Sequence, residues 1–123
     1  MSLSAKESEL HVIKLDHFRP GAKIRVLEED IPLFYTADIA MLVTGTDKDH
    51  AAEYIRRASA KHADIKETIV TRLIHFRQNY TAAAFVPFSA IPALIEGIGG
   101  KAAKAFRAKH GKALADFFLV CML

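Results

Sequence analysis

The sequence predicts one small domain of the α+β class, and three observations support this prediction. The chain has 123 residues, 51% of them hydrophobic, which is enough for one packed core and too short for two ordinary domains. Two pairs of β-branched and aromatic segments are each interrupted by a short polar turn, so each pair predicts a β-hairpin. Segments with helical spacing of apolar residues follow each pair. The resulting order, ββαα-ββαα with two β-hairpins and a basic C-terminal helix, favours α+β because tight turns join the paired strands.

In the first half, a hairpin is expected over residues 24–35, with the acidic turn at its centre. Thr36 is expected to cap a first helix, which Gly45 should end. A second helix should begin at the pair Thr46-Asp47 and run to about Lys61. Its predicted buried stripe consists of Ala51, Ile55, Ala58 and His62.

In the second half, another hairpin is expected over residues 68–88, followed by a short helix capped by Ser89. The glycine-rich segment 97–100 should end that helix. A final helix is predicted from about Lys101 to Leu119, and its internal glycine is expected to weaken it. Its apolar side consists of Ala103, Phe106, His110, Ala113, Leu114 and Phe117.

The predicted domain covers residues 24–119, with a partly irregular lead-in at 1–23 and an apolar tail at 120–123. The N-terminus lacks the order of a secretory signal, and no apolar stretch is long enough to span a membrane. The single cysteine, Cys121, allows no internal disulfide. We therefore expect an intracellular protein, in the cytoplasm or, in a eukaryotic host, the nucleus.

Positive charge is concentrated in the second half of the chain. The formal net charge is +3 and the pI is about 9.1, which alone indicates little about partners. After Glu67, however, seven cations face only Glu96 and Asp116. These cations are Arg72, Arg77, Lys101, Lys104, Arg107, Lys109 and Lys112.

On the final predicted helix, the lysines fall opposite the apolar side, and Arg107 lies at the flank. The lysines of this face are Lys101, Lys104, Lys109 and Lys112. A continuous basic face is what neutralisation of nucleic-acid phosphates requires. The same pattern is typical of a solvated helix face, and the sequence leaves both interpretations open. Arg72 and Arg77, on or just after the second hairpin's first strand, are secondary candidates for phosphate contact.

The segment from Gly97 to Lys101 could also offer backbone amides to an anion. A nucleotide phosphate loop would need a glycine where Ile95 stands and a serine or threonine where Ala102 stands. Nucleotide binding is therefore not expected here. A glycine-rich link between two helices is the simpler interpretation.

No metal, cofactor or catalytic site is expected. His50 and Glu53 form a histidine and carboxylate pair at helical spacing, without a second pair to complete a metal site. No nucleophile elbow surrounds Ser59 or Ser89. We predict a protein that is not an enzyme, while an enzyme acting on nucleic acid remains an alternative.

Two blocks of the sequence resemble the Bro-N domain of large DNA viruses and phage antirepressors. The first block joins Ile24-Arg25-Val26 to Pro32–Ala40 and ends at Gly45; the second contains Phe85-Val86, Ser89, Leu94-Ile95 and Ala103-Lys104-Ala105-Phe106-Arg107. The resemblance implies an α+β DNA-binding module of a viral or phage-type regulatory protein, usually at the N-terminus of a longer chain. Lys104 and Arg107 match its Ala-Lys-x-Phe-Arg motif residue by residue. The chain lacks the tryptophan that often follows this motif.

Taken together, the charge pattern and the resemblance predict binding to DNA, most simply double-stranded, through phosphate contacts. The main alternative is a protein-interaction module, because the apolar run from Phe117 to Leu123 would be exposed unless it packs on the domain or on a second copy. Such a tail makes a homo-oligomer possible. No membrane partner and no small-molecule substrate are expected.

Overall fold

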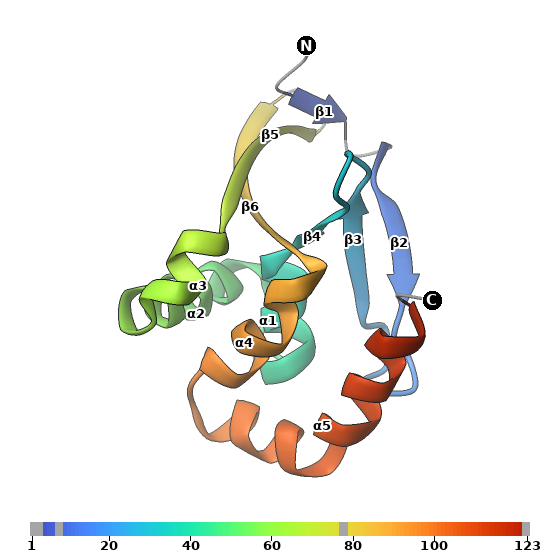
Figure 1. The fold of residues 1–123 in the computed structure, drawn as a ribbon, viewed down its shortest axis with the longest axis vertical. Helices are drawn as coiled ribbons and strands as arrows, with labels where there is room; N and C mark the ends of the chain where they lie inside the picture. Colours follow the sequence, from blue (N-terminus) through green and yellow to red (C-terminus); the bar gives the residue numbers. More distant parts are fainter. Residues whose placement is uncertain (1–3, 7–8, 77–78, 122–123) are drawn as a thin grey trace.

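The computed structural model describes residues 4–6, 9–76 and 79–121, and its fold is of the predicted α+β class. Its strands are β1 (Ser4–Lys6), β2 (His11–Lys14), β3 (Lys23–Leu27), β4 (Leu33–Tyr35), β5 (Val70–Phe76) and β6 (Asn79–Pro87). Its helical elements are α1 (Thr36–Thr44), α2 (Lys48–Lys61), α3 (Ala63–Thr68), the 3-10 turn η2 (Phe88–Ala90), α4 (Ile91–Gly97) and α5 (Lys101–Cys121). The strands form one sheet in the order β1-β5-β6-β4-β3-β2 (Figure 1).

Both predicted hairpins are confirmed. Strands β3 and β4 pair antiparallel, as do β5 and β6. The two hairpins join through β4 and β6, which also pair antiparallel and place Phe34 opposite Val86. This pairing links segments that are far apart in the sequence, and it merges the two hairpins into one sheet.

The lead-in contributes two strands that the sequence pattern does not predict. Strand β2 pairs antiparallel with β3, and β1 pairs parallel with β5. Between β2 and β3, a loop is closed by a hydrogen bond from the Leu15 amide to the Ala22 carbonyl, 2.9 Å long. Leu15 is fully buried within the core, so this part of the lead-in packs as part of the domain.

The start of α1 differs from the prediction, whereas its end agrees. Tyr35 is the N-cap, and Thr36 lies inside the helix with its hydroxyl donating to the Ala84 carbonyl at 2.8 Å. Thr36 therefore fastens α1 to β6 and does not cap the helix. Gly45 ends the helix with φ of 72°, a left-handed conformation that glycine adopts without steric cost.

The predicted cap of α2 is confirmed, since the Asp47 carboxylate accepts a hydrogen bond from the His50 amide at 2.9 Å. Two other predictions were wrong. His62 is exposed, because α2 ends at Lys61 and a further short helix, α3, begins at Ala63. Ser89 makes no side-chain cap, because it lies inside the 3-10 turn that precedes α4.

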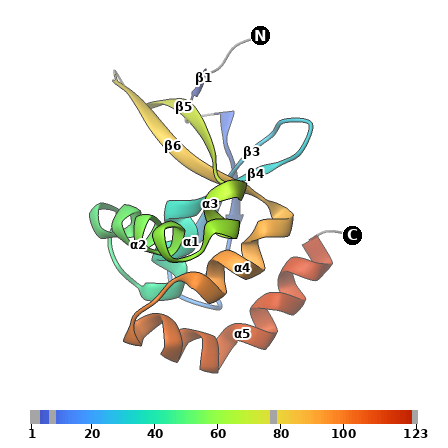
Figure 2. The same ribbon diagram turned by 60° about the vertical axis from the view of Figure 1, so that its left-hand side comes forward.

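The helices gather on one side of the molecule, and the arm formed by β5 and β6 extends away from them (Figure 2). Helix α1 lies at the centre of this layer and packs against α2 and α5. Of its residues, Ile39, Ala40 and Val43 are completely buried. Helix α5 forms the outer edge of the layer, which places one of its faces in solvent (Figure 2).

A buried ion pair attaches α1 to the sheet. Asp38, whose side chain is completely buried, accepts hydrogen bonds from the Arg25 backbone amide at 2.8 Å and from Nε and Nη2 of Arg25 at 3.0 Å each. The Arg25 guanidinium also lies 4.9 Å from the centre of the Tyr35 ring. The carboxylate thus holds both the backbone and the side chain of β3.

Candidate nucleic-acid interface

Helix α5 begins after a sharp turn of the backbone at the glycines that precede it. Gly100 has φ of 100°, and its carbonyl accepts the hydrogen bond from the Lys104 amide that starts the helix. A Cβ at Gly100 would lie 3.5 Å from a ring carbon of Tyr54, which is ordinary contact, so the backbone conformation is what favours glycine. The helix then continues for 21 residues, through Gly111, and is about 30 Å long at 1.5 Å per residue.

The inner face of α5 packs on the domain largely as predicted. Ala103, Phe106 and Leu114 are buried, and Phe118 is buried in addition. Ala113, predicted to be part of this face, is exposed. These contacts fix the rotation of the helix, and therefore fix which residues face the solvent.

His110 is half-buried among aromatic rings at the edge of this inner face. Its ring centre lies 5.0 Å from that of Phe106 and 5.8 Å from that of Phe18. His17 and Phe18, in the loop between β2 and β3, also contact Phe117. The lead-in thus supports the second half of α5, a contact that spans most of the sequence.

The outer face of α5 carries the four predicted lysines, and all four are exposed. We call Lys101, Lys104, Lys109 and Lys112 the lysine face. None of these lysines forms an ion pair or a side-chain hydrogen bond with any residue that the structure describes. Their ammonium groups are therefore available to an external anion.

Arg107 has a different position from the lysines. It is half-buried, and its Nη1 donates hydrogen bonds to the carbonyls of Ile95 at 3.0 Å and Ile98 at 2.7 Å. These carbonyls lie at the C-terminal end of α4, where backbone acceptors lack helical partners. Arg107 therefore joins α5 to α4. The spacing of residues in the sequence does not reveal this structural contact.

Arg72 is also engaged within the molecule. Its guanidinium forms two hydrogen bonds with the Glu29 carboxylate, of 2.8 and 3.0 Å. These bonds hold the pKa of Glu29 below its ordinary value. Arg72 lies opposite Ala83 on β6, whose side chain is small. Glu29 therefore partly neutralises the positive charge that made Arg72 a candidate for phosphate contact. Arg77, the other candidate on this hairpin, lies outside the described residues.

Near the tip of the same hairpin, the rings of His75 and Tyr80 stack with their centres 4.6 Å apart and their planes at 18°. Tyr80 is 62% exposed. The Tyr80 ring of this aromatic pair is therefore available for an external contact. It is separate from the lysine face, since the hairpin extends away from the helices (Figure 2).

Helix α2 brings further cations to the start of α5. A hollow of about 150 Å³ is lined by Tyr54, Arg57 and Lys61 of α2 and by the glycines before α5. Arg57 shares the Glu53 carboxylate with Arg56, and these two guanidiniums lower the pKa of Glu53 to about 2. Lys61 is exposed. The sequence offers no signal for this proximity, because it arises from the packing of α2 beside the glycine segment.

Comparison with known proteins identified no relative: no family model, no curated protein and no solved structure matches this chain. Within residues 4–6, 9–76 and 79–121, no helix is long and apolar enough to cross a membrane. Across the same residues, no three histidine, cysteine or acidic side chains are grouped to hold a metal ion. The described site can attract and hold anions through its ammonium groups.

Proposed function

We propose that this chain binds double-stranded DNA by placing the lysine face of α5 against backbone phosphates. The observation that carries the proposal is the set of four exposed lysines with no carboxylate partner among the described residues. DNA carries one negative charge per about 1.7 Å of its axis, so phosphates are dense enough for each lysine along a 30 Å helix to meet one. The resemblance to the Bro-N domain independently supports a DNA-binding module of a viral or phage-type regulator.

The proposal gives different roles to the candidate residues. The four lysines are the primary phosphate contacts, because their charge is not used within the described part of the molecule. Arg107 is a positioning residue, because it fastens the basic helix to α4. Arg72 is a weaker candidate, since Glu29 already binds it.

The proposal can be tested by titrating a fluorescent DNA duplex with the protein at several salt concentrations. If four lysines contact phosphates, the logarithm of affinity should fall with the logarithm of salt with a slope of roughly −3 to −4. The double variant Lys104→Glu/Lys112→Glu should lose at least about tenfold in affinity and about 2 in slope. Both positions are exposed, so the circular dichroism spectrum should not change.

The matched control is Lys14→Glu/Lys66→Glu, which changes the net charge equally at exposed positions on β2 and α3. This control should retain most of the affinity. Equal losses in both double variants would contradict the proposed face, as would an affinity that does not depend on salt. The same titration with single-stranded DNA tests the preference for a duplex.

Self-association is a second candidate function, favoured by a specific surface. Leu119 and Val120 are 61% and 67% exposed at the end of α5. Leu119 also lines a groove of about 300 Å³ between α4 and α5, together with apolar side chains such as Pro92 and Phe118. A patch with both a groove and protruding apolar groups suits a symmetric dimer. Sedimentation at two protein concentrations should show a dimer that Leu119→Lys/Val120→Lys abolishes; a concentration-independent monomer would exclude this function.

A further inference from the structure

The groove between α4 and α5 is apolar along most of its length and has Arg107 in its wall. Its volume of about 300 Å³ is at the lower end of the range for small-molecule sites. On α5 the lining runs from Arg107 to Leu119, which is about 18 Å of helix at 1.5 Å per residue. An occupant should therefore have an extended apolar body. The apolar lining includes Phe88, Ile91, Pro92, Ile95, Leu114 and Phe118.

Gly111 leaves open space beside this groove. It lies in the interior of a 21-residue helix, where glycine is less favourable than alanine. Its backbone does not have the positive φ of Gly100. Apart from its chain neighbours and the backbone of its own helix, no heavy atom of the described residues would lie within 4 Å of a Cβ at Gly111. Neither backbone conformation nor packing among these residues accounts for the glycine, and its small size permits the close approach of an external group.

Arg107 has a preoriented hydrogen-bonding edge at the groove. Its Nη1 donates to the carbonyls of Ile95 and Ile98 at 3.0 and 2.7 Å, and Ile95 also lines the groove. These two bonds engage Nη1 alone, so the edge formed by Nε and Nη2 has no partner among the described residues. Because carbonyl oxygens carry no net charge, the half-buried guanidinium keeps its positive charge.

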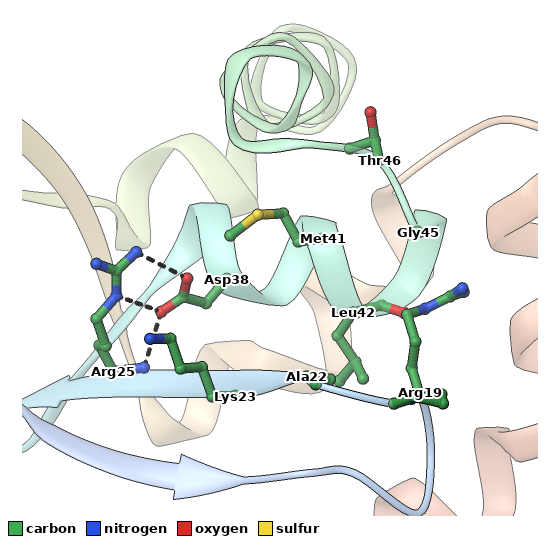
Figure 3. Close-up of a pocket in the computed structure, with 11 residues that line it drawn as sticks. Arg19, Ala22, Lys23, Arg25, Asp38, Met41, Leu42, Gly45 and Thr46 are labelled. Carbon is green, nitrogen blue, oxygen red and sulfur yellow. Dashed lines mark hydrogen bonds and ion pairs between the residues drawn. The ribbon is translucent and has the colours of Figure 1, made fainter.

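Two other arginines show what this edge binds in the same molecule. In Arg25, Nε and Nη2 donate to the two carboxylate oxygens of Asp38 at 3.0 Å each (Figure 3). Arg72 binds both carboxylate oxygens of Glu29 through the same two nitrogens. The planar fork of a guanidinium matches the spacing of two carboxylate oxygens. Arg107 has the same fork but no carboxylate partner among the described residues.

We propose that this groove binds a monocarboxylic acid with an extended apolar chain, such as a medium-chain fatty acid. The carboxylate accepts hydrogen bonds from Nε and Nη2 of Arg107, and its single negative charge matches the one guanidinium. The apolar chain lies along α5 over Gly111. Glu96 also lines the groove, but it is exposed and forms no ion pair with any described residue, so solvent screens its charge.

The test is an NMR titration of the ¹⁵N-labelled chain with octanoate, 1-octanol and acetate, without DNA. Octanoate should shift the Gly111 amide signal and the side-chain Nε–H signal of Arg107. Octanol lacks the charge, so it should bind about fivefold more weakly or worse and leave the Nε–H signal in place. Acetate lacks the apolar chain and should not shift Gly111 at the same concentrations. Equal affinities for octanoate and octanol, or an Arg107 Nε–H signal that octanoate does not move, would overturn the proposal.

Gly111→Leu should abolish octanoate binding, because the added side chain occupies the open space beside the groove. Leucine favours a helix, so the circular dichroism spectrum should not change. The matched control is Ala108→Leu, which adds the same side chain at an exposed position of α5 outside the groove lining. This control should bind octanoate as the unmodified chain does. Unchanged binding by Gly111→Leu, or an equal loss in both variants, would contradict the assignment of the groove.

Two further measurements separate this site from the other functions. Gly111→Leu should keep its affinity for duplex DNA, because the lysine face lies outside the groove lining. Lost duplex affinity would assign the groove to DNA and overturn the proposal. Sedimentation with and without octanoate tests a second copy as the occupant. A dimer that Gly111→Leu abolishes and octanoate does not dissociate would assign the groove to that copy.

Discussion

Charged side chains are buried and paired at the junction of β3 with α1, whereas those on the outer face of α5 are exposed to solvent. At the junction, Arg25 and Asp38 are buried and share three hydrogen bonds. On the lysine face, four ammonium groups are exposed and have no partner among the described residues. Burial makes the junction important for stability, because an unpaired charge there cannot be solvated. Exposure makes the lysine face unimportant for stability and available for binding.

The other arginines lie between these two extremes. Arg107 bonds to backbone carbonyls in a half-buried position, and Arg72 bonds to a carboxylate at the surface. The comparison therefore predicts a graded series, in which the effect of a substitution on stability follows burial and the number of internal hydrogen bonds. It also teaches that a basic residue in a promising sequence pattern is a binding candidate only where its charge is not used internally.

The largest loss of stability is expected for Asp38→Ala, because it removes the carboxylate that accepts three hydrogen bonds from the buried Arg25. Removing one partner of a buried ion pair costs about 3–5 kcal/mol, which urea denaturation would measure. Asp116→Ala is the control, since Asp116 is exposed on α5 and its substitution should cost less than about 0.5 kcal/mol. A loss below about 1 kcal/mol for Asp38→Ala would contradict the importance of the junction.

A smaller loss is expected for Arg107→Ala, which leaves the carbonyls of Ile95 and Ile98 without the guanidinium donor. Hydrogen bonds to a charged group are worth about 1.5–3 kcal/mol, and partial exposure places the expected loss near the lower end. Lys104→Ala, one turn away on the exposed face, should leave the urea midpoint nearly unchanged. If Arg107→Ala lowered DNA affinity without changing stability, Arg107 would be a phosphate contact and not a positioning residue.

Arg72→Gln should change stability by less than about 1 kcal/mol, because its pair with Glu29 lies at the surface, where ion pairs contribute little. The pair is accessible to salt, so the difference from the unmodified chain should shrink as salt is added. Urea denaturation at low and high salt measures both effects. A cost comparable to that of Asp38→Ala would show that surface and buried pairs do not differ here as proposed.

The smallest effect concerns the fully exposed pair of Asp47 and His50, and it should appear as a raised pKa of His50. The Asp47 carboxylate, 2.7 Å from Nδ1 of His50, raises the pKa of His50 above its ordinary value of 6.5. The stabilisation from the charged histidine is therefore present below pH 6.5 and disappears as pH rises through the raised pKa. At lower pH, the stabilisation disappears as pH falls through the lowered pKa of Asp47, because protonation of the Asp47 carboxylate removes the same attraction.

An NMR titration of the His50 ring measures this effect. In Asp47→Asn, the pKa of His50 should move back toward 6.5, because the carboxylate charge is lost. Asparagine is also a good N-cap, so α2 should keep its N-terminal cap and the variant should isolate the electrostatic contribution. An unchanged His50 pKa in this variant would show that Asp47 does not interact with the ring in solution.

The sequence determined the features that depend on neighbouring residues. Alternation and turn residues predict both hairpins, Gly45 and Asp47 mark helix ends through local backbone preferences, and helical periodicity separates the lysine face from the buried side of α5. These features follow from the chemistry of short segments. They do not require knowledge of what packs against them.

Tertiary structure alone decided which charges are used internally. The contact of Arg72 with Glu29 joins residues 43 positions apart, and Thr36 contacts Ala84, 48 positions away, in place of capping its own helix. The lead-in strand β1 pairs with β5 at Ile74, although its short sequence has no pattern of its own. Such contacts depend on the sheet order, which brings distant segments together to bury apolar surface. Local sequence contains no record of that proximity, so it identifies the basic residues but not their partners.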